Sequence, residues 1–457
     1  MALAPLFATA PHARSGGHAA TLGVASGATA NGIVCAWLID TISNFGGFGV
    51  VPAILLYAAL IAWTTVPFVT TAWLLRRAGP AAPVLLAPAL WVSAEFLFPN
   101  FFPWRLAYTQ REWPMLIQSA SVAGPWLLSF AIAWVSSALV TRRLRALAPP
   151  ALAVLLLAAW GALEIRTEER LDASAGEFRV GIVQGNLSIA QKHSAGDAAK
   201  NLAHYRSLSE TLQPLPDLVV WPETVVTTAI PRNRALSGTS DPWPGAPVPL
   251  LFGAVSYERG DEGLEWYNTL FLRSRDGSLG GRYDKIVLMP FGEFLPFEDM
   301  FPGIRTISPH SGDFEAGRGS EVFTLDDGAR VGPAICYEDM LPSPLGSSAA
   351  EGAQVLVSVA NDAWYQGSSA LLLHETLGIW RAVENRRYFL RSTNTGLTSG
   401  LDPVGRRFFS LPEGEATAAI ATVRLRSDST FYQRAGDWFA WGVLVLAAVL
   451  LGWTRRS

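Results

Sequence analysis

The chain has 457 residues, of which 50% are hydrophobic and 16% charged, whereas an ordinary soluble domain is roughly 25% charged. This composition excludes a disordered chain and a disulfide scaffold, and it argues against a purely soluble enzyme. The net charge of −3 lacks the basic excess of nucleic-acid-binding proteins, so we expect no nucleic-acid partner. Cys35 and Cys336 lie in segments of different character, and we expect no disulfide between them.

The apolar residues gather in two parts of the chain, 20–165 and 437–453. An apolar run of roughly 20 residues is long enough to span a bilayer as a helix. We therefore predict six transmembrane helices, at about 21–43, 49–75, 80–98, 115–140, 148–165 and 437–453. Buried helices of a large soluble core are the alternative, but such helices are usually shorter and amphipathic.

These runs predict an N-terminal segment, a polytopic helical membrane domain, a large polar domain and a C-terminal transmembrane helix with its tail. Their bounds are 1–20, 21–165, 166–434 and 435–457. Arginines follow the second, fourth and sixth predicted helices: Arg76, Arg77, Arg142, Arg143, Arg145, Arg455 and Arg456. Because basic loops stay in the cytoplasm, we expect the polar domain on the opposite, periplasmic side of a bacterial inner membrane.

The polar domain alternates predicted strands with predicted helices. Apolar runs bounded by turn residues predict strands at 178–186, 218–223, 249–258, 266–274, 329–338, 354–362, 388–396 and 416–425. Helices fit 195–213 and 369–387. Near-continuous apolar strands are typically buried on both faces, so we expect an α/β layered domain with one or two packed sheets.

Reactive side chains follow three of these strands, at the strand ends where α/β domains place their sites. They are Glu223 in WPET, Lys285 and Glu293 in YDKIVLMPFGE, and Cys336 in ICYED. Each has a simpler interpretation: a solvated turn residue, a surface charge and a small core cysteine, respectively. Taken together they make coherent chemistry, because a carboxylate can accept the thiol proton and an ammonium can stabilise the oxyanion that forms when the thiolate attacks a carbonyl.

The order of these motifs resembles the nitrilase superfamily and, within it, the bacterial apolipoprotein N-acyltransferases. The resemblance rests on WPE at 221–223, on Y-x-K followed by PFGEFLP, and on ICYE at 335–338. It extends to FPWRLAYTQ at 102–110, VQGN at 183–186 and RSTNTGLTSGLDPVG at 391–405. Three motifs in order, surrounded by membrane helices, are a far more specific signal than any one of them.

The resemblance implies a membrane domain joined to a nitrilase-like α-β-β-α sandwich. It also implies transfer of an acyl chain from a phospholipid to the α-amino group of a lipoprotein's N-terminal diacylglyceryl-cysteine. Cys336 would carry the acyl chain as a thioester, Glu223 would be the general base and Lys285 would stabilise the oxyanion. The expected partners are the phospholipid donor, diacylglyceryl-modified lipoproteins and membrane lipid, with no cofactor and no metal.

Other residues have supporting roles by the same resemblance. Glu293 would hold the lysine and the base through hydrogen bonds, the backbone N–H of Tyr337 would donate to the oxyanion, and Glu338 follows the nucleophile as in the family. Trp364 and Tyr365 would line the acyl pocket, unless they are core aromatics.

The sequence departs from the family at two places. His193 stands where the family usually has a tryptophan, which bears on substrate handling. The family generally has eight membrane helices, and the two that we do not find would precede residue 21. The Pro- and Gly-punctuated segment 294–307 is either a lipid-facing lid or an ordinary packed loop.

Two other functions stay open. A membrane-anchored amidase of the same superfamily would use the same trio and admit water to the thioester, and a scaffold or lipid-binding protein would have lost the activity. The membrane region with FPWRLAYTQ favours transfer, because an enzyme that hydrolyses small amides does not need it. His374 and Glu375 form a lone pair on a predicted helix and are expected at the surface, without metal-ligand spacing.

Overall fold

The computed structural model describes residues 3–45, 49–193, 196–232, 241–261, 263–296, 298, 300, 303, 305, 312–365 and 367–454, except for the side chains of Asn44, Phe45, His193 and Trp364. The chain forms two compact units. The helical unit comprises Met1–Ser43, Phe48–Thr167 and Thr430–Ser457. The α/β unit comprises Asn44–Gly47 and Glu168–Ser429.

The helical unit consists of apolar helices joined by short turns. Its longer helices are α2 (Gly16–Val34), α4 (Val50–Thr64), α5 (Val66–Ala78), α6 (Leu86–Leu97), α9 (Trp126–Val140), α10 (Leu144–Ser174) and α17 (Trp438–Thr454). Its shorter helices are α1 (Ala4–Thr9), η1 (Ala10–His12), α3 (Leu38–Phe45), η2 (Leu106–Gln110), α7 (Pro114–Ile117), α8 (Ala120–Ala123) and α16 (Phe431–Ala435).

Among the described residues, two helical runs are long and apolar enough to cross a membrane, Val50–Ala78 and Leu144–Ser174. The helices Leu86–Leu97, Trp126–Val140 and Trp438–Thr454 are apolar but shorter. The unit therefore fits a membrane domain, and the count of six spans stays a prediction.

Three of the predicted helices are interrupted, and the run 49–75 is divided at Thr65 into α4 and α5. The run 115–140 forms α7, α8 and α9, and α8 ends before α9 because Gly124 adopts a φ of +56° and Pro125 follows it. A left-handed residue ends an α-helix, and a proline cannot supply the N–H that would continue it. The run 21–43 forms α2 and α3, with Cys35 at the turn between them.

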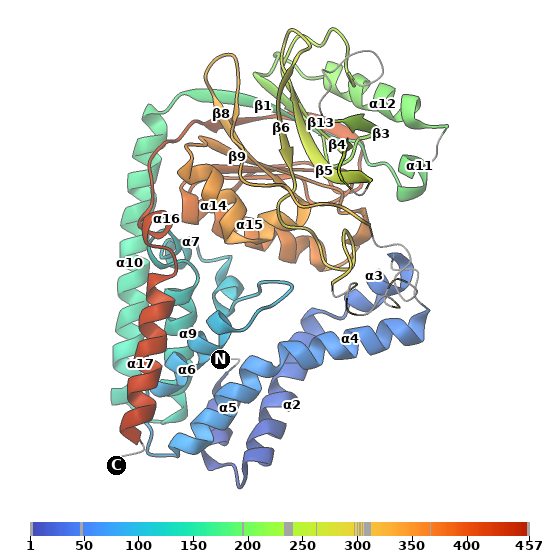
Figure 1. The fold of residues 1–457 in the computed structure, drawn as a ribbon. Coiled ribbons are helices and arrows are strands. Elements are labelled where there is room, and N and C mark those ends of the chain that lie inside the picture. Colours follow the sequence, from blue (N-terminus) through green and yellow to red (C-terminus); the bar gives the residue numbers. More distant parts are fainter. Residues whose placement is uncertain are drawn as a thin grey trace. The chain divides into compact units, whose positions relative to one another are not determined.

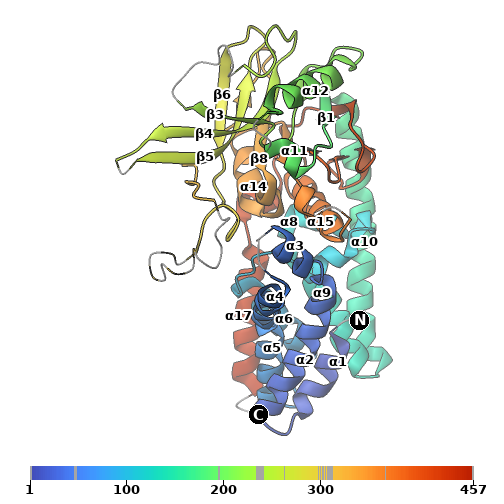
Figure 2. The ribbon, with the colours of Figure 1, turned by 90° about the vertical axis from the view of Figure 1, so that its right-hand side faces the viewer.

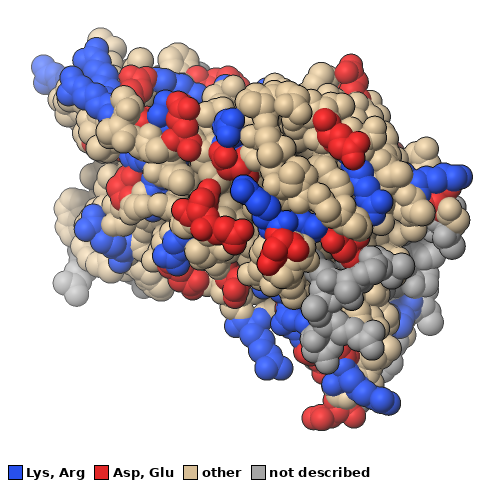
Figure 3. Space-filling model, turned by 90° about the horizontal axis from the view of Figure 1, so that it is seen from above, with Lys and Arg blue, Asp and Glu red and all other residues tan. Residues whose placement is uncertain are grey.

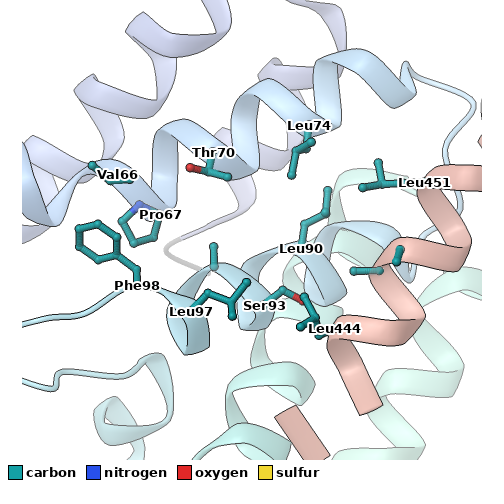
Figure 4. Close-up of a pocket in the computed structure, with 13 residues that line it drawn as sticks. Val66, Pro67, Thr70, Leu74, Leu90, Ser93, Leu97, Phe98, Leu444 and Leu451 are labelled. Carbon is teal, nitrogen blue, oxygen red and sulfur yellow. The ribbon is translucent and has the colours of Figure 1, made fainter. Parts of the chain in front are cut away.

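An apolar groove lies between α5, α6 and α17 (Figure 4). It encloses about 300 Å³ and is lined by Val66, Pro67, Thr70, Leu74, Leu90, Ser93, Ala94, Leu97, Phe98, Leu444, Ala447, Ala448 and Leu451. The hydroxyl of Ser93 donates to the Ala89 carbonyl within its own helix, at 2.7 Å. The groove thus presents mainly hydrocarbon, as expected of a surface that faces lipid tails.

The α/β unit contains two sheets. The first has the order β13-β1-β2-β4-β5-β6, with β3 paired to β4, and the second has the order β12-β11-β10-β9-β8-β7. The strands of the first are β1 (Glu177–Gln184), β2 (Leu218–Val220), β3 (Val226–Pro231), β4 (Leu250–Arg259), β5 (Leu264–Arg273), β6 (Leu279–Asp284) and β13 (Thr417–Arg424). The strands of the second are β7 (Phe323–Thr324), β8 (Arg330–Ile335), β9 (Val355–Ala360), β10 (Tyr388–Thr393), β11 (Ser399–Leu401) and β12 (Arg407–Ser410).

The two sheets pack face to face and carry helices on their outer faces (Figures 1 and 2). The apolar core between them joins residues of both sheets, including Val180, Ile182, Leu251, Leu270, Val331, Val357 and Leu390. Helix α12 (Ala198–Glu210) covers the first sheet, and α14 (Pro342–Ala350) and α15 (Ala370–Asn385) cover the second. This confirms the expected α-β-β-α sandwich.

All eight predicted strands and both predicted helices of this unit are present, with ends shifted by a few residues. The sequence pattern did not predict β3, β6, β7, β11 and β12, nor the helices α11 (Ile189–His193) and α14. On the face shown in Figure 3, acidic and basic side chains are interspersed, in keeping with the net charge of −3.

Candidate active site

Cys336 is the first residue after the buried strand β8 and begins the short helix η4 (Cys336–Met340). Its φ of +52° costs a non-glycine residue roughly 1–2 kcal/mol. Two more non-glycine residues with positive φ adjoin the predicted site, Thr224 (+49°) after Glu223 and Phe291 (+64°) two residues before Glu293. Backbone strain of this kind clusters at functional sites, where the surrounding structure holds it in place.

Glu338 connects two parts of the site by hydrogen bonds: the turn that contains Cys336 and the segment after Lys285. Its Oε1 accepts hydrogen bonds from the backbone N–H groups of Ile286 (2.7 Å) and Val287 (3.0 Å). Its Oε2 accepts one from Ile335 (2.8 Å). Burial raises the pKa of Glu338 to about 7, although Lys285 and these N–H groups oppose the rise. The carboxyl therefore acts as an internal clamp.

Lys285 forms a buried ion pair with Glu293, with Nζ 2.7 Å from Oε2. The lysine is 1% exposed, and the same Oε2 accepts a hydrogen bond from the Met289 backbone N–H at 2.8 Å. Burial by itself lowers the pKa of Lys285, but the negative charges of Glu293, Cys336 and Glu223 outweigh burial and raise the pKa above its usual value. Lys285 is thus held as an ammonium.

Glu223 lies three residues beyond β2, at a turn pressed against Gly253 of β4. A Cβ on Gly253 would lie 2.4 Å from the backbone nitrogen of Thr224 and 2.8 Å from the Cα of Glu223. Only glycine permits this approach. The turn buries the Glu223 side chain to 9% exposure, which contradicts the solvated-turn interpretation.

Asn268, in the middle of β5, joins the two carboxylates and was missed by the sequence analysis. Its Nδ2 donates to Oε1 of Glu223 and to Oε1 of Glu293, each at 2.8 Å. Its backbone carbonyl accepts the N–H of Lys285 at 2.9 Å. The available signal was a lone amide inside the apolar strand WYNTLFL, because a buried polar group needs partners.

The charges of Glu223 and Lys285 act on the thiol of Cys336. Burial raises the pKa of Cys336 well above its usual value, the charge of Glu223 raises it further, and Lys285 lowers it. The resting group is therefore a neutral thiol with a carboxylate acceptor nearby. Such an arrangement suits proton transfer during attack, with an ammonium in place for the oxyanion.

The remaining predicted site residues are placed in part. Tyr337 is 7% exposed, and burial raises its pKa to about 12. Burial, and then the negative charge at Cys336, raise the pKa of Tyr365. The side chains of His193 and Trp364 lie outside the described residues, as do residues 297, 299, 301, 302, 304, 306 and 307 of the predicted lid.

The expectation of a surface position for His374 and Glu375 is wrong. They are 1% and 0% exposed, because α15 is covered along this stretch on its polar side as well as its apolar side. Glu375 pairs there with Arg407. Charged partners on neighbouring segments thus make burial of this pair tolerable.

His374 belongs to a buried cluster beside the nucleophile. Its Nε2 lies 2.5 Å from Oδ1 of Asp339, and its Nδ1 lies 3.4 Å from Oδ1 of Asp362. Arg391 contacts the same two carboxylates, with Nε 3.0 Å from Asp339 and Nη2 3.3 Å from Asp362. The cluster ties the helix that starts at Cys336 to the segment after β9.

Two sequence families match the chain. The profile of the carbon-nitrogen hydrolases matches residues 179–429, and that of the apolipoprotein N-acyltransferase N-terminal domain matches residues 1–138. An apolipoprotein N-acyltransferase from Geobacter metallireducens is 31% identical over 95% of this chain and 87% of its own. One from Azotobacter vinelandii is 34% identical over 91% of this chain and 82% of its own.

The chain belongs to the apolipoprotein N-acyltransferase family. The carbon-nitrogen hydrolase match contains Glu223, Lys285 and Cys336 together with their supporting residues. The chain is accordingly an enzyme of the carbon-nitrogen hydrolase superfamily with the nitrilase-like fold, and residues 1–138 match the N-terminal domain of the N-acyltransferases.

Solved structures of the nitrilase superfamily align with part of the chain. Nit3 of Saccharomyces cerevisiae is 20% identical, with a TM-score of 0.41 over 54% of this chain and 90% of its own. A mutant of an amidase from Nesterenkonia is 16% identical, with a TM-score of 0.39 over 58% of this chain and 96% of its own.

Proposed function

We propose that the chain transfers an acyl chain from a phospholipid to the α-amino group of the N-terminal diacylglyceryl-cysteine of lipoproteins. The assembly of the half-buried Cys336 with the buried Glu223 and Lys285 carries the proposal, because it supplies a nucleophile, a base and a cation in a chain of this family. The names of the relatives supply the acceptor class.

In the first half-reaction Sγ of Cys336 attacks the ester carbonyl of the phospholipid while its proton passes to the Glu223 carboxylate. A C–S bond forms, and the carbonyl oxygen takes up the negative charge. When the tetrahedral intermediate collapses, the ester C–O bond breaks and Glu223 returns the proton to the leaving alkoxide. The products are a lysophospholipid and a thioester on Cys336.

The oxyanion of this intermediate is stabilised by the Lys285 ammonium and the backbone N–H of Tyr337. Loss of one such donor typically costs on the order of 100- to 1000-fold in rate. Glu293 and Asn268 keep the lysine and the base in place through the contacts described above. In this proposal Tyr365 lines the acyl site, where a negative charge on Cys336 acts on its phenol.

In the second half-reaction the neutral α-amino group of the lipoprotein attacks the thioester. The C–N bond forms and the C–S bond breaks, Glu223 accepts the amine proton, and the proton passes to the leaving thiolate of Cys336. The amide product leaves the enzyme in its starting state, so the cycle needs no cofactor. Water in place of the amine would give hydrolysis instead.

We propose that the enzyme is a multi-pass protein of the bacterial inner membrane with the α/β unit in the periplasm. Two features support this: the long apolar helices, and the arginines between the predicted spans. Both substrates are lipids, and lifting an acyl chain into water costs about 0.8 kcal/mol per CH₂ group. A catalytic unit held at the membrane avoids most of that cost.

Intact-mass spectrometry of the full chain, incubated with phospholipid but no acceptor, tests the proposed function. The expected result is a mass increase of one acyl chain that is absent from Cys336→Ala. A diacylglyceryl-cysteine peptide should discharge this adduct faster than water does. No adduct on folded protein would sink the proposal, and discharge by water alone would make the chain an amidase-type hydrolase.

A further inference from the structure

A second buried lysine lies beside the base. Lys192, on the short helix α11, is 5% exposed and donates from Nζ to the backbone carbonyl of Glu223 at 2.8 Å. The mechanism above does not use it. A fully buried lysine is uncommon because the ammonium loses its hydration, so its position calls for a physical reason.

Lys192 holds the turn that presents the base. The Glu223 carbonyl belongs to the peptide that leads into Thr224, whose φ of +49° is strained for a β-branched residue. Gly253 lies against one side of this turn, and the Lys192 ammonium donates to the backbone carbonyl of Glu223. A charge-assisted hydrogen bond of this kind fixes the peptide, and with it the direction of the Glu223 side chain.

Lys192 also balances the charge of the site. Glu223 and Glu293 are two carboxylates, and Lys285 neutralises one of them. The Lys192 ammonium interacts favourably both with Glu223 and with a negative charge on Cys336. When the proton moves from Sγ to the Glu223 carboxylate, an S–H bond breaks and an O–H bond forms, so the charge moves toward the thiol while both ammoniums stay nearby.

We propose that Lys192 is a positioning residue for Glu223 and the second positive charge needed to activate Cys336. This role rests on the proposed thioester function and adds to it a residue outside the Glu–Lys–Cys trio. It assigns the short helix α11 a part in catalysis.

The proposal has a pH signature. Burial lowers the pKa of Lys192 to about 8, although Glu223 and Cys336 oppose the decrease. The positive charge is therefore present below pH 8 and lost above it. Helix α12 packs against α11. At its start Asp197, the N-cap residue, pairs with Lys200 at the surface at 3.0 Å, and further along His204 contacts the Gly185 carbonyl.

The test measures how fast iodoacetamide alkylates Cys336 in the full chain, by peptide mass, from pH 6 to 10. Lys192→Met should react about tenfold more slowly than wild type at pH 7, which corresponds to a rise of about one unit in the thiol pKa. The difference should shrink above pH 8, where wild-type Lys192 has itself lost its charge. Lys192→Arg, which stays charged, should match wild type at pH 7 and exceed it above pH 8.

Lys200→Met is the matched control, because Lys200 is 82% exposed in the same region, and its rates should equal those of wild type. A Lys192→Met rate equal to wild type, or a difference that does not change with pH, overturns the proposal. If Lys192→Met does not fold, the pH dependence of Lys192→Arg alone decides. Alkylation needs no acyl donor, so absence of the phospholipid adduct would refute the proposed function without touching this result.

Discussion

At the scale of single residues, Asn268 is the most informative side chain, because one amide nitrogen serves two carboxylates. Asn268→Ala removes both hydrogen bonds and leaves Glu223 and Glu293 facing each other across the vacated space. We expect acyl-enzyme formation to slow by roughly 10- to 100-fold, since two charge-assisted hydrogen bonds to the base and its neighbour are lost. Intact-mass spectrometry of reactions quenched at successive times measures this rate.

Asn268→Asp sharpens the same test. It keeps the shape of the side chain but adds a third carboxylate against two others, so it should be slower than Asn268→Ala. An Asn268→Asp enzyme as fast as wild type would contradict the bridging role.

Cys336 provides a test of backbone strain that is independent of activity. Replacing an ordinary residue by glycine usually costs about 0.5–1 kcal/mol, but at a φ of +52° glycine avoids a strain of roughly 1–2 kcal/mol. Cys336→Gly should therefore have a melting temperature equal to or above that of Cys336→Ala, although both are inactive. A clearly less stable Cys336→Gly would show that this turn is unstrained.

At the scale of elements, the cluster of Asp339, Asp362, His374 and Arg391 connects η4, the segment after β9, α15 and β10. All four side chains are at most 1% exposed. Arg391→Leu would leave two buried carboxylates with His374 alone, and removing one partner of a buried ion pair costs about 3–5 kcal/mol. We expect a large drop in melting temperature, measured by differential scanning fluorimetry in detergent.

Arg406→Leu is the control for that loss. Arg406 pairs with Glu169 at 2.7 Å, but both side chains are about half exposed, at 43% and 53%. Exposed pairs contribute only about 0–1 kcal/mol. Similar melting temperatures for the two variants would mean that the buried cluster does not stabilise the fold.

The same cluster predicts how stability depends on pH. Burial raises the pKa of Asp339, but His374 and Arg391 outweigh burial and lower it below its usual value. The folded-state pKa thus lies below the unfolded-state value of about 3.9, so this contribution is complete at neutral pH and is lost as the pH falls below about 5. Asp339→Asn should flatten the acid side of the melting-temperature profile, and an unchanged slope there would contradict this.

The sequence predicted strands that are buried on both faces, such as β9 and β10, because burial between a sheet and a helix layer leaves a continuous hydrophobic run. The partly exposed β13 was predicted from its apolar composition. The strands β3 and β12 were missed. Their side chains are partly exposed, and their sequences, VTTAIP and RFFS, show little regular alternation of apolar and polar residues. Likewise, PSPLGSSAA has the composition of a loop, yet it forms α14 because Pro342 begins a helix that packs on β8.

The residues of the candidate active site also fall into a group that the sequence predicted and a group that it missed. Cys336, Lys285 and Glu223 stood next to strand ends in recognisable motifs. Asn268 and His374 did not, since their partners come from residues far apart in the chain. A single sequence gives the local pattern, but it does not show which buried charges the fold brings together.

At the scale of the whole molecule, the helical unit exposes many apolar side chains, and their exposure to water would be unfavourable. Val50, Leu55, Leu155, Leu156 and Val445 are each at least 60% exposed. A soluble monomer rarely exposes apolar patches of more than a few hundred Å². The hydrocarbon interior of a bilayer is the medium that suits such helices. A chain held in a bilayer is also surrounded by the lipids from which the proposed acyl donor comes.

The orientation of the chain in the membrane gives the last prediction. Single cysteines at Arg143 and Lys200, both exposed positions, report on the two sides when Cys35 and Cys336 are replaced by serine. In intact cells with a permeabilised outer membrane, a membrane-impermeant maleimide should label Lys200→Cys and spare Arg143→Cys until the inner membrane is opened. The basic loops hold their positions because moving arginines across the membrane is costly. Labelling of Arg143→Cys in intact cells, with Lys200→Cys protected, would put the α/β unit in the cytoplasm and separate it from lipoproteins displayed on the other side.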